Sequence, residues 1–325
     1  MKKVTLFSLS LLLLAACSSD NEPQSGTNTT DPVEIKLNSG IETVTRSDGP
    51  ISNTLGDDLP ISIARIDATS APTTYPDYKA LLATSVHNAR INKTGNAVNF
   101  RNTNDDANKS LYYLTNGYNT KLIAWYPRGT FAAGDGTNAA NVTFSISDGQ
   151  TDVMLSAEVA GKKSSTINSI NLSHLLTQIQ VKAYAFDAAA VDKWGKLTAA
   201  VKIKNQSTTC KVTLPGTQSS EIVFSGTQDT SLSNTFATAT ALPTSSESAI
   251  DCGYAMIAPI TTSSVMTLEV TTEFGQTVEV PLTAQTYARS QVYVVTLIFK
   301  TTTVSPTVAI GAWDTDTTPI TGDVN

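Results

Sequence analysis

Apolar and polar residues alternate with a period of two in many short segments of this 325-residue sequence. Because successive side chains of a strand point to opposite faces, this alternation predicts half-buried strands with one face in water. Polar turns separate the segments, and strands do not alternate with helices. The pattern therefore predicts an all-β fold of antiparallel β-sandwiches. The alternating segments are residues 33–37, 142–146, 179–185 and 197–203.

Two longer patterns extend this expectation. Residues 266–270 and 278–282 alternate on either side of a polar segment, so they predict a hairpin with Gly275 in its turn. Residues 291–299 are apolar on both faces, which predicts a central, fully buried strand.

Helical signals are few. Apolar residues recur at helical spacing over 78–89, after Pro76-Asp77, which predicts a short helix there. Residues 187–194 precede Gly195 and should form a single short helix or a loop. The expected fold class is therefore all-β with few short helices.

Chain length and a polar break predict two domains. A chain of this length can hold one large domain or two of ordinary size. Segment 161–166 contains glycine, lysine and hydroxyl residues and is typical of a flexible break. We expect an N-terminal β-sandwich domain over 33–165 and a C-terminal one over 166–325. One long sandwich is the alternative.

The composition excludes one class of partner. Charged residues make up only 15% of the chain, and the formal net charge is -6. Polarity comes mainly from Thr and Ser, as is common in extracellular β-proteins. An acidic balance argues against binding nucleic acid, which requires a basic face.

The N-terminal segment has the layout of a secretory signal. A basic start precedes an apolar run over 4–14, which is too short to cross a bilayer as a helix. Ala15-Ala16-Cys17 follows, and a cysteine directly after small residues is typical of a bacterial lipoprotein. We expect removal of residues 1–16 and acylation of Cys17, palmitate included. An ordinary secretory signal with a chance cysteine is the alternative.

Residues 17–32 are polar and acidic and lack apolar periodicity, so we expect a flexible tether. An acidic cluster after a lipid-bearing cysteine resembles the signal that sends lipoproteins of some two-membrane bacteria to the outer face of the outer membrane. The expected location is therefore the cell outer membrane, lipid-anchored and surface-exposed. Several acyl chains hold a protein firmly, since each buried methylene contributes roughly 0.8 kcal/mol.

Two cysteines remain besides Cys17. In an oxidising compartment Cys210 and Cys252 could form a disulfide that closes a loop of about 40 residues and contributes on the order of 3–4 kcal/mol. Both lie in strand-like segments, so two separate buried thiols are the alternative.

The sequence nominates no catalytic site. It has two histidines, His87 and His174, and no zinc-protease, CxxC, nucleophile-elbow or phosphate-loop motif. We interpret His174 as a histidine at a strand start that is hydrogen-bonded to backbone. Segments 102–106 and 314–316 lack the glycine and distal glutamate of a calcium loop and are interpreted as solvated turns. We expect no enzyme activity, no cofactor and no metal.

Four short segments and a late tryptophan, ordered along nearly the whole chain after the tether, carry a family resemblance. They read LIAWYP at 122–127, QTDVM at 150–154, SHLLTQIQV at 173–181, YAMIAP at 254–259, and a late Trp313. In this order and behind a lipoprotein signal, they resemble the fimbrillin family of type V pilins and related tip and anchor proteins.

The resemblance implies an adhesive filament subunit with two transthyretin-like β-sandwich domains. Subunits of that family reach the surface as lipoproteins, and a protease then cuts after an arginine and removes the lipid with the first strand. A strand from another fimbrial subunit fills the groove, in a homopolymer or a mixed filament. In such β-augmentation, main-chain hydrogen bonds supply affinity and alternating side chains supply register.

This chain has candidates for each part. Residues 33–37 resemble the first strand, and Arg46-Ser47 lies in a turn-like segment that a protease could reach. Segment 303–313 is the candidate donor strand, and its Pro306 suits an edge strand. The alternatives are an ordinary loop arginine and a C-terminal strand that completes its own domain. The candidate donor residues are Val304, Thr307, Val308, Ala309 and Ile310.

The function expected is a structural subunit of cell-surface adhesive fimbriae that polymerises by strand exchange after proteolysis. The alternative is an uncleaved surface lipoprotein adhesin, or a tip or anchor protein, that binds host glycoproteins or other bacteria. A hydrolase on a β-sandwich is a third class, for which no segment supplies a site.

Overall fold

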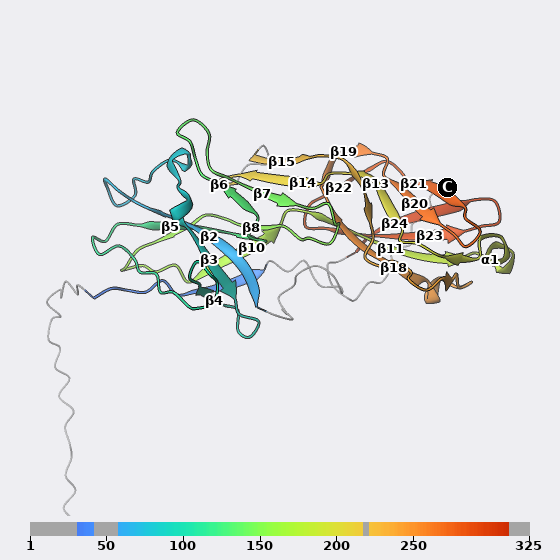
Figure 1. Ribbon diagram of the computed structural model, residues 1–325, viewed down its shortest axis with the longest axis horizontal. Coiled ribbons are helices and arrows are strands. Elements are labelled where there is room, and N and C mark those ends of the chain that lie inside the picture. Colours follow the sequence, from blue (N-terminus) through green and yellow to red (C-terminus); the bar gives the residue numbers. More distant parts are fainter. Residues whose placement is uncertain (1–30, 42–57, 217–220, 312–325) are drawn as a thin grey trace, which may run out of the picture. The chain divides into compact units, whose positions relative to one another are not determined.

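The computed structural model describes residues 31–41, 58–216 and 221–311 (Figure 1). This part of the chain consists almost entirely of strands and loops, so the fold is all-β, as predicted. Its helical elements are the α-helix α1 (Ala188–Trp194) and the short 3-10 turns η1 (Tyr78–Ala80), η2 (Ala83–Ser85) and η4 (Ser246–Ser248).

The largest sheet closes on itself. Its strand order is β2-β3-β4-β1-β10-β8-β5-β9, and β5 also pairs with β2. The closed sheet surrounds a core of buried aliphatic and aromatic side chains, including Ile61, Ile63 and Leu122. Its strands are β1 (Leu37–Ile41), β2 (Leu59–Asp67), β3 (Val86–Ile91), β4 (Ala97–Phe100), β5 (Thr120–Tyr126), β8 (Met154–Ser156), β9 (Val159–Gly161) and β10 (Ser169–His174).

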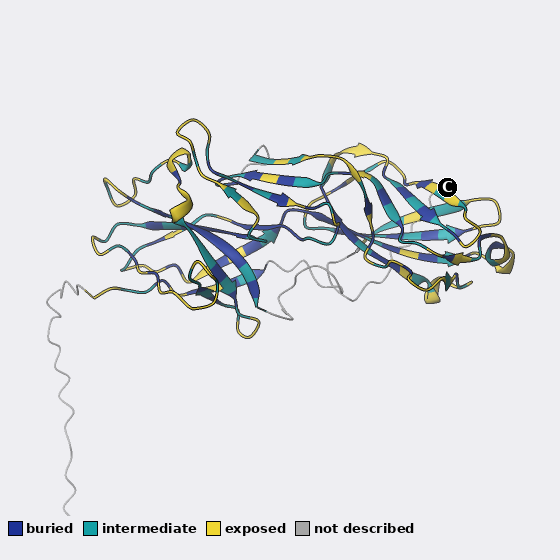
Figure 2. Ribbon diagram, in the orientation of Figure 1, coloured by how far each residue is buried: buried dark blue, intermediate teal, exposed yellow. Residues whose placement is uncertain are grey.

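Two four-stranded sheets, β18-β11-β23-β24 and β16-β13-β20-β21, contribute to a second core. Buried and exposed residues alternate along many of their strands (Figure 2). Their strands are β11 (Thr177–Ala185), β13 (Lys202–Gln206), β16 (Gln228–Ser231), β18 (Ile250–Ile257), β20 (Thr267–Thr271), β21 (Thr277–Pro281), β23 (Val292–Phe299) and β24 (Val304–Gly311).

A third four-stranded sheet, β15-β14-β7-β6, joins strands from distant parts of the sequence. A third core beside it includes Phe144, Cys210 and Met256. Strand pairing thus crosses the expected boundary near residue 165, and the two-domain division stays a prediction. The remaining strands are β6 (Thr130–Ala132), β7 (Asn141–Ser145), β14 (Thr209–Thr213), β15 (Ile222–Ser225), and the pairs β12 (Lys196–Leu197) with β17 (Thr240–Ala241) and β19 (Ile260–Ser264) with β22 (Gln285–Tyr287).

The predicted hairpin forms, and the segment expected to be a short helix or a loop is a helix. The hairpin β20–β21 forms with Gly275 at φ +70° in its turn. Helix α1 begins after Asp187, whose carboxylate accepts a hydrogen bond from the Ala190 N–H at 2.8 Å, and ends at Gly195 with φ +68°.

The helix predicted over 78–89 is wrong. Only η1 and η2 form there, and Val86–Ile91 becomes strand β3, which pairs with β2 from Leu59 to Ala64. The apolar residues at the end of this segment are instead the buried residues of a strand, since Ala89 and Ile91 face the core of the closed sheet. Long-range pairing overrides the local helical pattern here.

Three further expectations need correction. The alternation over 197–203 is interrupted, because β12 ends at Leu197 and β13 begins at Lys202. Strand β23 is central, but Val294, Thr296 and Ile298 on one face are only partly buried. The pairing is not purely antiparallel, because β1 pairs with β10 and β11 with β23 in parallel. Long connections between those strands permit parallel pairing.

Candidate functional site

Strand β1 completes the closed sheet. It pairs in parallel with β10 and antiparallel with β4. Leu37 and Ile41 are 4% and 5% exposed and belong to the core of that sheet. Sequence reasoning put the first strand at 33–37, but β1 begins only at Leu37. The preceding residues are held by a bridge between Glu34 and Tyr112.

Backbone hydrogen bonds fix this segment in its place. The Ile35 N–H donates to Leu111 O at 2.7 Å, and the Asn38 N–H donates to Asn168 O at 2.9 Å. Its side chains lie in the same core as those of the two flanking strands. Removing residues before 42 would therefore leave an apolar slot with unpaired strand edges. The core residues of the flanking strands are Val98, Phe100, Ile170 and Leu172.

Cys17, Arg46 and Ser47 lie outside the described residues. Their roles in lipidation and processing therefore stay predictions.

Strand β24 carries the candidate donor residues. It pairs antiparallel with β23 along its whole length, from Val304↔Phe299 to Gly311↔Val292. It is the outer strand of its sheet in the described part of the chain. Val304 and Val308 pack against the second core, whereas Ile310 is 61% exposed. In this structure the strand completes the chain's own sheet, and its donation stays a prediction.

Cys210 and Cys252 are both free thiols. Cys210 is a residue of β14 and Cys252 a residue of β18, and their side chains belong to different cores. The structure therefore has the alternative arrangement of two separate buried thiols, and the disulfide is not formed. Burial raises the pKa of the Cys210 thiol to about 12 and raises that of Cys252 as well, so neither forms a thiolate at neutral pH.

His174 is the last residue of β10, not the first of a strand. Its Nδ1 lies 2.8 Å from Asp152 Oδ2, and both side chains are almost completely buried. The predicted hydrogen bond from His174 to backbone is wrong for Nδ1, because the partner of this atom is the Asp152 carboxylate. Ser290 Oγ donates to the His174 carbonyl at 2.7 Å. Two of the family-like segments therefore meet in this buried pair.

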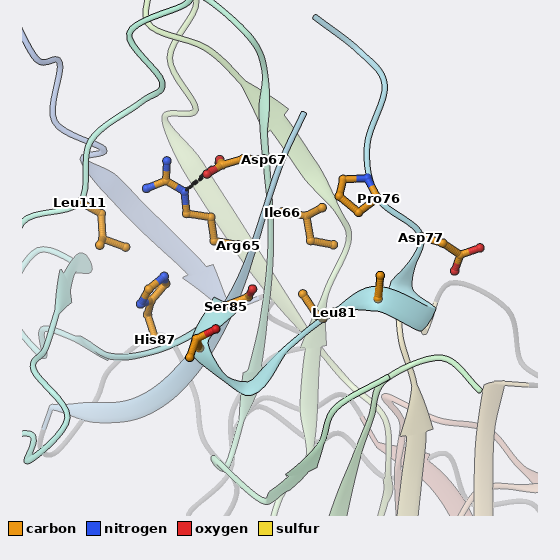
Figure 3. A pocket seen from close by; sticks show the side chains of 11 residues that line it. Arg65, Ile66, Asp67, Pro76, Asp77, Leu81, Ser85, His87 and Leu111 are labelled. Atoms are coloured by element: carbon orange, nitrogen blue, oxygen red, sulfur yellow. Dashed lines mark hydrogen bonds and ion pairs between the residues drawn. The ribbon is translucent and has the colours of Figure 1, made fainter. Parts of the chain in front are cut away.

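A cavity of about 460 Å³ opens where the closed sheet ends beside β2 and η2 (Figure 3). On β2, Ile61 and Ile63 face the core, and the same alternation continues into Arg65 and Asp67. His87 pairs with Ile63 on the neighbouring strand. The inward face of the sheet thus becomes polar at this end.

The polar groups of the cavity are only partly satisfied. Arg65 Nε donates to Asp67 Oδ1 at 2.9 Å, and Thr120 Oγ1 donates to the same oxygen at 2.6 Å. Among the described residues, nothing hydrogen-bonds to the imidazole of His87 or to the terminal nitrogens of Arg65. Burial, followed by the charges of Lys109 and Arg65, lowers the pKa of His87 to about 4.

Sequence reasoning missed this cavity, because its residues come from separate strands and loops. The available signal was the replacement of aliphatic residues by Arg65 and Asp67 at inward positions of an alternating strand.

Other kinds of site are not found in the described part of the chain. It holds no cluster of three or more His, Cys, Asp or Glu side chains suited to a metal ion. Segment 102–106 forms a turn, whose Asp105 binds Arg90 and Arg128. Among the described helices, none has the length and apolar character needed to cross a membrane.

Comparison with known proteins identifies the family. A family model described as fimbrillin-like matches residues 45–313, which is most of the chain. The chain belongs to this family, so the resemblance found in the sequence is confirmed. Family membership supports a structural role as a fimbrial subunit at the cell surface. No curated protein matches the chain.

Three solved structures with a similar fold come from Bacteroides species. A candidate cell adhesion protein of Bacteroides uniformis is 16% identical with a TM-score of 0.60, and the match covers 88% of this chain and 99% of that chain. A second candidate cell adhesion protein, from Bacteroides ovatus, is 19% identical with a TM-score of 0.56 over 88% and 99%. A fimbrial protein of Bacteroides vulgatus is 12% identical with a TM-score of 0.51 over 87% and 100%. At these identities the likeness concerns the fold alone.

Proposed function

We propose that this chain is a structural subunit of adhesive fimbriae that is exported as a lipoprotein through Cys17. A cut between Arg46 and Ser47 then removes the lipid and β1 together. A strand of another subunit fills the vacated slot, and β24 is the candidate donor. Until the cut, the subunit is anchored in the outer membrane.

The observation that carries the proposal is the position of β1. It is an interior strand of a closed sheet, yet it lies before Arg46 in the sequence. A cut there would leave β4 and β10 with facing unpaired edges and an apolar floor between them. Exposed strand edges of this kind recruit a strand from another chain.

The test is the N-terminus of the assembled protein. We expect mass spectrometry of surface-sheared filaments to give an N-terminus at Ser47. Arg46→Gln should leave the lipidated form starting at Cys17 and abolish filaments. The matched control is Arg289→Gln, which removes the same charge from an exposed site outside this segment. Filaments of subunits that still start at Cys17 would contradict the proposal.

The cavity beside β2 favours a second function, adhesion by an uncleaved lipoprotein or a tip subunit. Its unpartnered polar groups could contact a ligand in either form of the protein. Filaments are not required for this function, so the N-terminal measurement separates the two.

A further inference from the structure

The cavity beside β2 has a definite chemical character. Its uncommitted groups are the terminal nitrogens of Arg65, which only donate, and the imidazole of His87 and the hydroxyls of Thr84 and Ser85, which can each donate a hydrogen bond and also accept one. Asp67 already accepts from Arg65 and Thr120. Asp77 caps η1 by accepting from the Lys79 N–H at 2.9 Å. The free groups therefore suit a ligand that accepts hydrogen bonds.

The electrostatic environment favours an anion. Burial lowers the pKa of His87 most, Lys109 and Arg65 lower it further as like charges, and Asp67 opposes them, so two cations and one carboxylate act on the imidazole. Figure 3 shows the Arg65 guanidinium and the His87 ring on the same side of the cavity as Leu111, with Asp77 on the other side. A carboxylate placed between Arg65 and His87 would gain charge-assisted hydrogen bonds.

The size and the apolar lining narrow the ligand further. A volume of about 460 Å³ lies within the range of roughly 300–1,000 Å³ typical of small-molecule sites. A cavity of this volume can hold one or two sugar rings. Leu111 and Ile66 belong to the lining, although only 7% and 6% of their surfaces are exposed, and Thr84 and Ser85 can bond the hydroxyls of a ring.

We propose that this cavity binds a carboxylate-bearing sugar, with the carboxylate on Arg65 and His87 and the ring hydroxyls on Thr84 and Ser85. The inference deepens the adhesive part of the proposed function by naming the chemistry of its target. Binding needs neither the cut at Arg46 nor filaments.

The two histidines permit a direct test by NMR. In protein labelled at histidine, D-glucuronate should shift the His87 imidazole signals saturably and leave those of buried His174 unchanged. D-glucose should cause no shift, because it lacks the carboxylate. Acetate should bind at least about tenfold more weakly than glucuronate, because it lacks the ring contacts.

Variants test the residues. Arg65→Gln should weaken glucuronate binding by about tenfold or more, because a charge-assisted contact is lost. His87→Gln, measured by calorimetry, tests the same site if Arg65→Gln does not fold. Arg289→Gln is the matched control and should bind as the unmodified protein does.

Several outcomes would overturn the inference. They are an absence of saturable shifts with glucuronate, equal binding of glucose, equal binding of acetate, and tighter binding of a polyglutamate peptide than of the sugar. If glucuronate binds but filaments do not start at Ser47, the strand-exchange proposal fails and this inference stands. If filaments start at Ser47 but glucuronate does not bind, this inference fails and the strand-exchange proposal stands.

Discussion

His87 is held neutral at pH 7 by its surroundings. Burial of the ring lowers its pKa most, and Lys109 and Arg65 lower it further, to about 4. In the unfolded chain a histidine has a pKa of about 6.5. Between these values the unfolded state binds more protons than the folded state, so folding stability falls as the pH is lowered.

We expect the free energy of unfolding to decrease between pH 6.5 and pH 4 by on the order of 1–3 kcal/mol through His87 alone. His87→Gln has no titrating ring and should lose this part of the pH dependence. Urea unfolding at pH 7 and at pH 4.5 measures the difference. The contribution of the carboxylates is common to both proteins and cancels. Equal losses of stability in both would contradict the assignment.

The Asp152–His174 pair is the second residue-scale feature with a measurable role. Asp152→Ala removes the carboxylate beside the buried Nδ1 atom. We expect a loss of roughly 2–4 kcal/mol of stability, because the buried imidazole of His174 loses its hydrogen-bond partner. Chemical denaturation measures it. Asp192→Ala on the exposed side of α1 is the control and should change stability by less than about 0.5 kcal/mol.

At the scale of elements, β1 differs from other interior strands. Its contribution to the stability of the subunit should depend on whether the chain has been cut after Arg46. Leu37 is 4% exposed in the core of the closed sheet. Leu37→Ala should cost the unprocessed subunit roughly 2–5 kcal/mol of stability, since a cavity forms in that core. The same substitution should have no effect once the chain starts at Ser47.

Thermal or urea unfolding of both forms measures this dependence. Lys36→Ala is the control, because Lys36 is the exposed neighbour of Leu37 and should be neutral in both forms. A destabilisation by Leu37→Ala that survives processing would mean that β1 remains bound after the cut.

Elements that depend on neighbouring residues could be predicted from the sequence. The hairpin around Gly275 and the helix capped by Asp187 are of this kind, since their turn and cap residues act within a few positions. Strand β3 could not be predicted, because its pairing with β2 overrides a helical apolar pattern. The cavity could not be predicted either, since Arg65, His87 and Leu111 meet only through long-range pairing.

At the scale of the whole molecule, the parallel pairing of β1 with β10 links the N-terminal strand to residues more than 120 positions away. No local pattern encodes such a contact. It makes one sheet depend on a segment that the proposed cut would remove. On the proposed function, the subunit before the cut is a closed unit, and the subunit after it would need a strand from elsewhere.

The donor role of β24 can be separated from its role in the monomer. Val304, Val308 and Ile310 share one face of the strand, and Ile310 is 61% exposed while the other two pack against the second core. If the strand is donated, this face should enter the apolar slot left by β1, and Ile310 should become buried.

Ile310→Asp should therefore leave the stability of the monomer almost unchanged and block polymerisation, because burying an unpaired carboxylate in an apolar slot is costly. Size-exclusion chromatography and electron microscopy of subunits that start at Ser47 measure assembly. Thr307→Asp is the control, because Thr307 is exposed but lies on the opposite face. Normal filaments from Ile310→Asp would mean that this face of β24 does not fill the slot. A carboxylate blocks assembly only if position 310 becomes buried when the strand is donated.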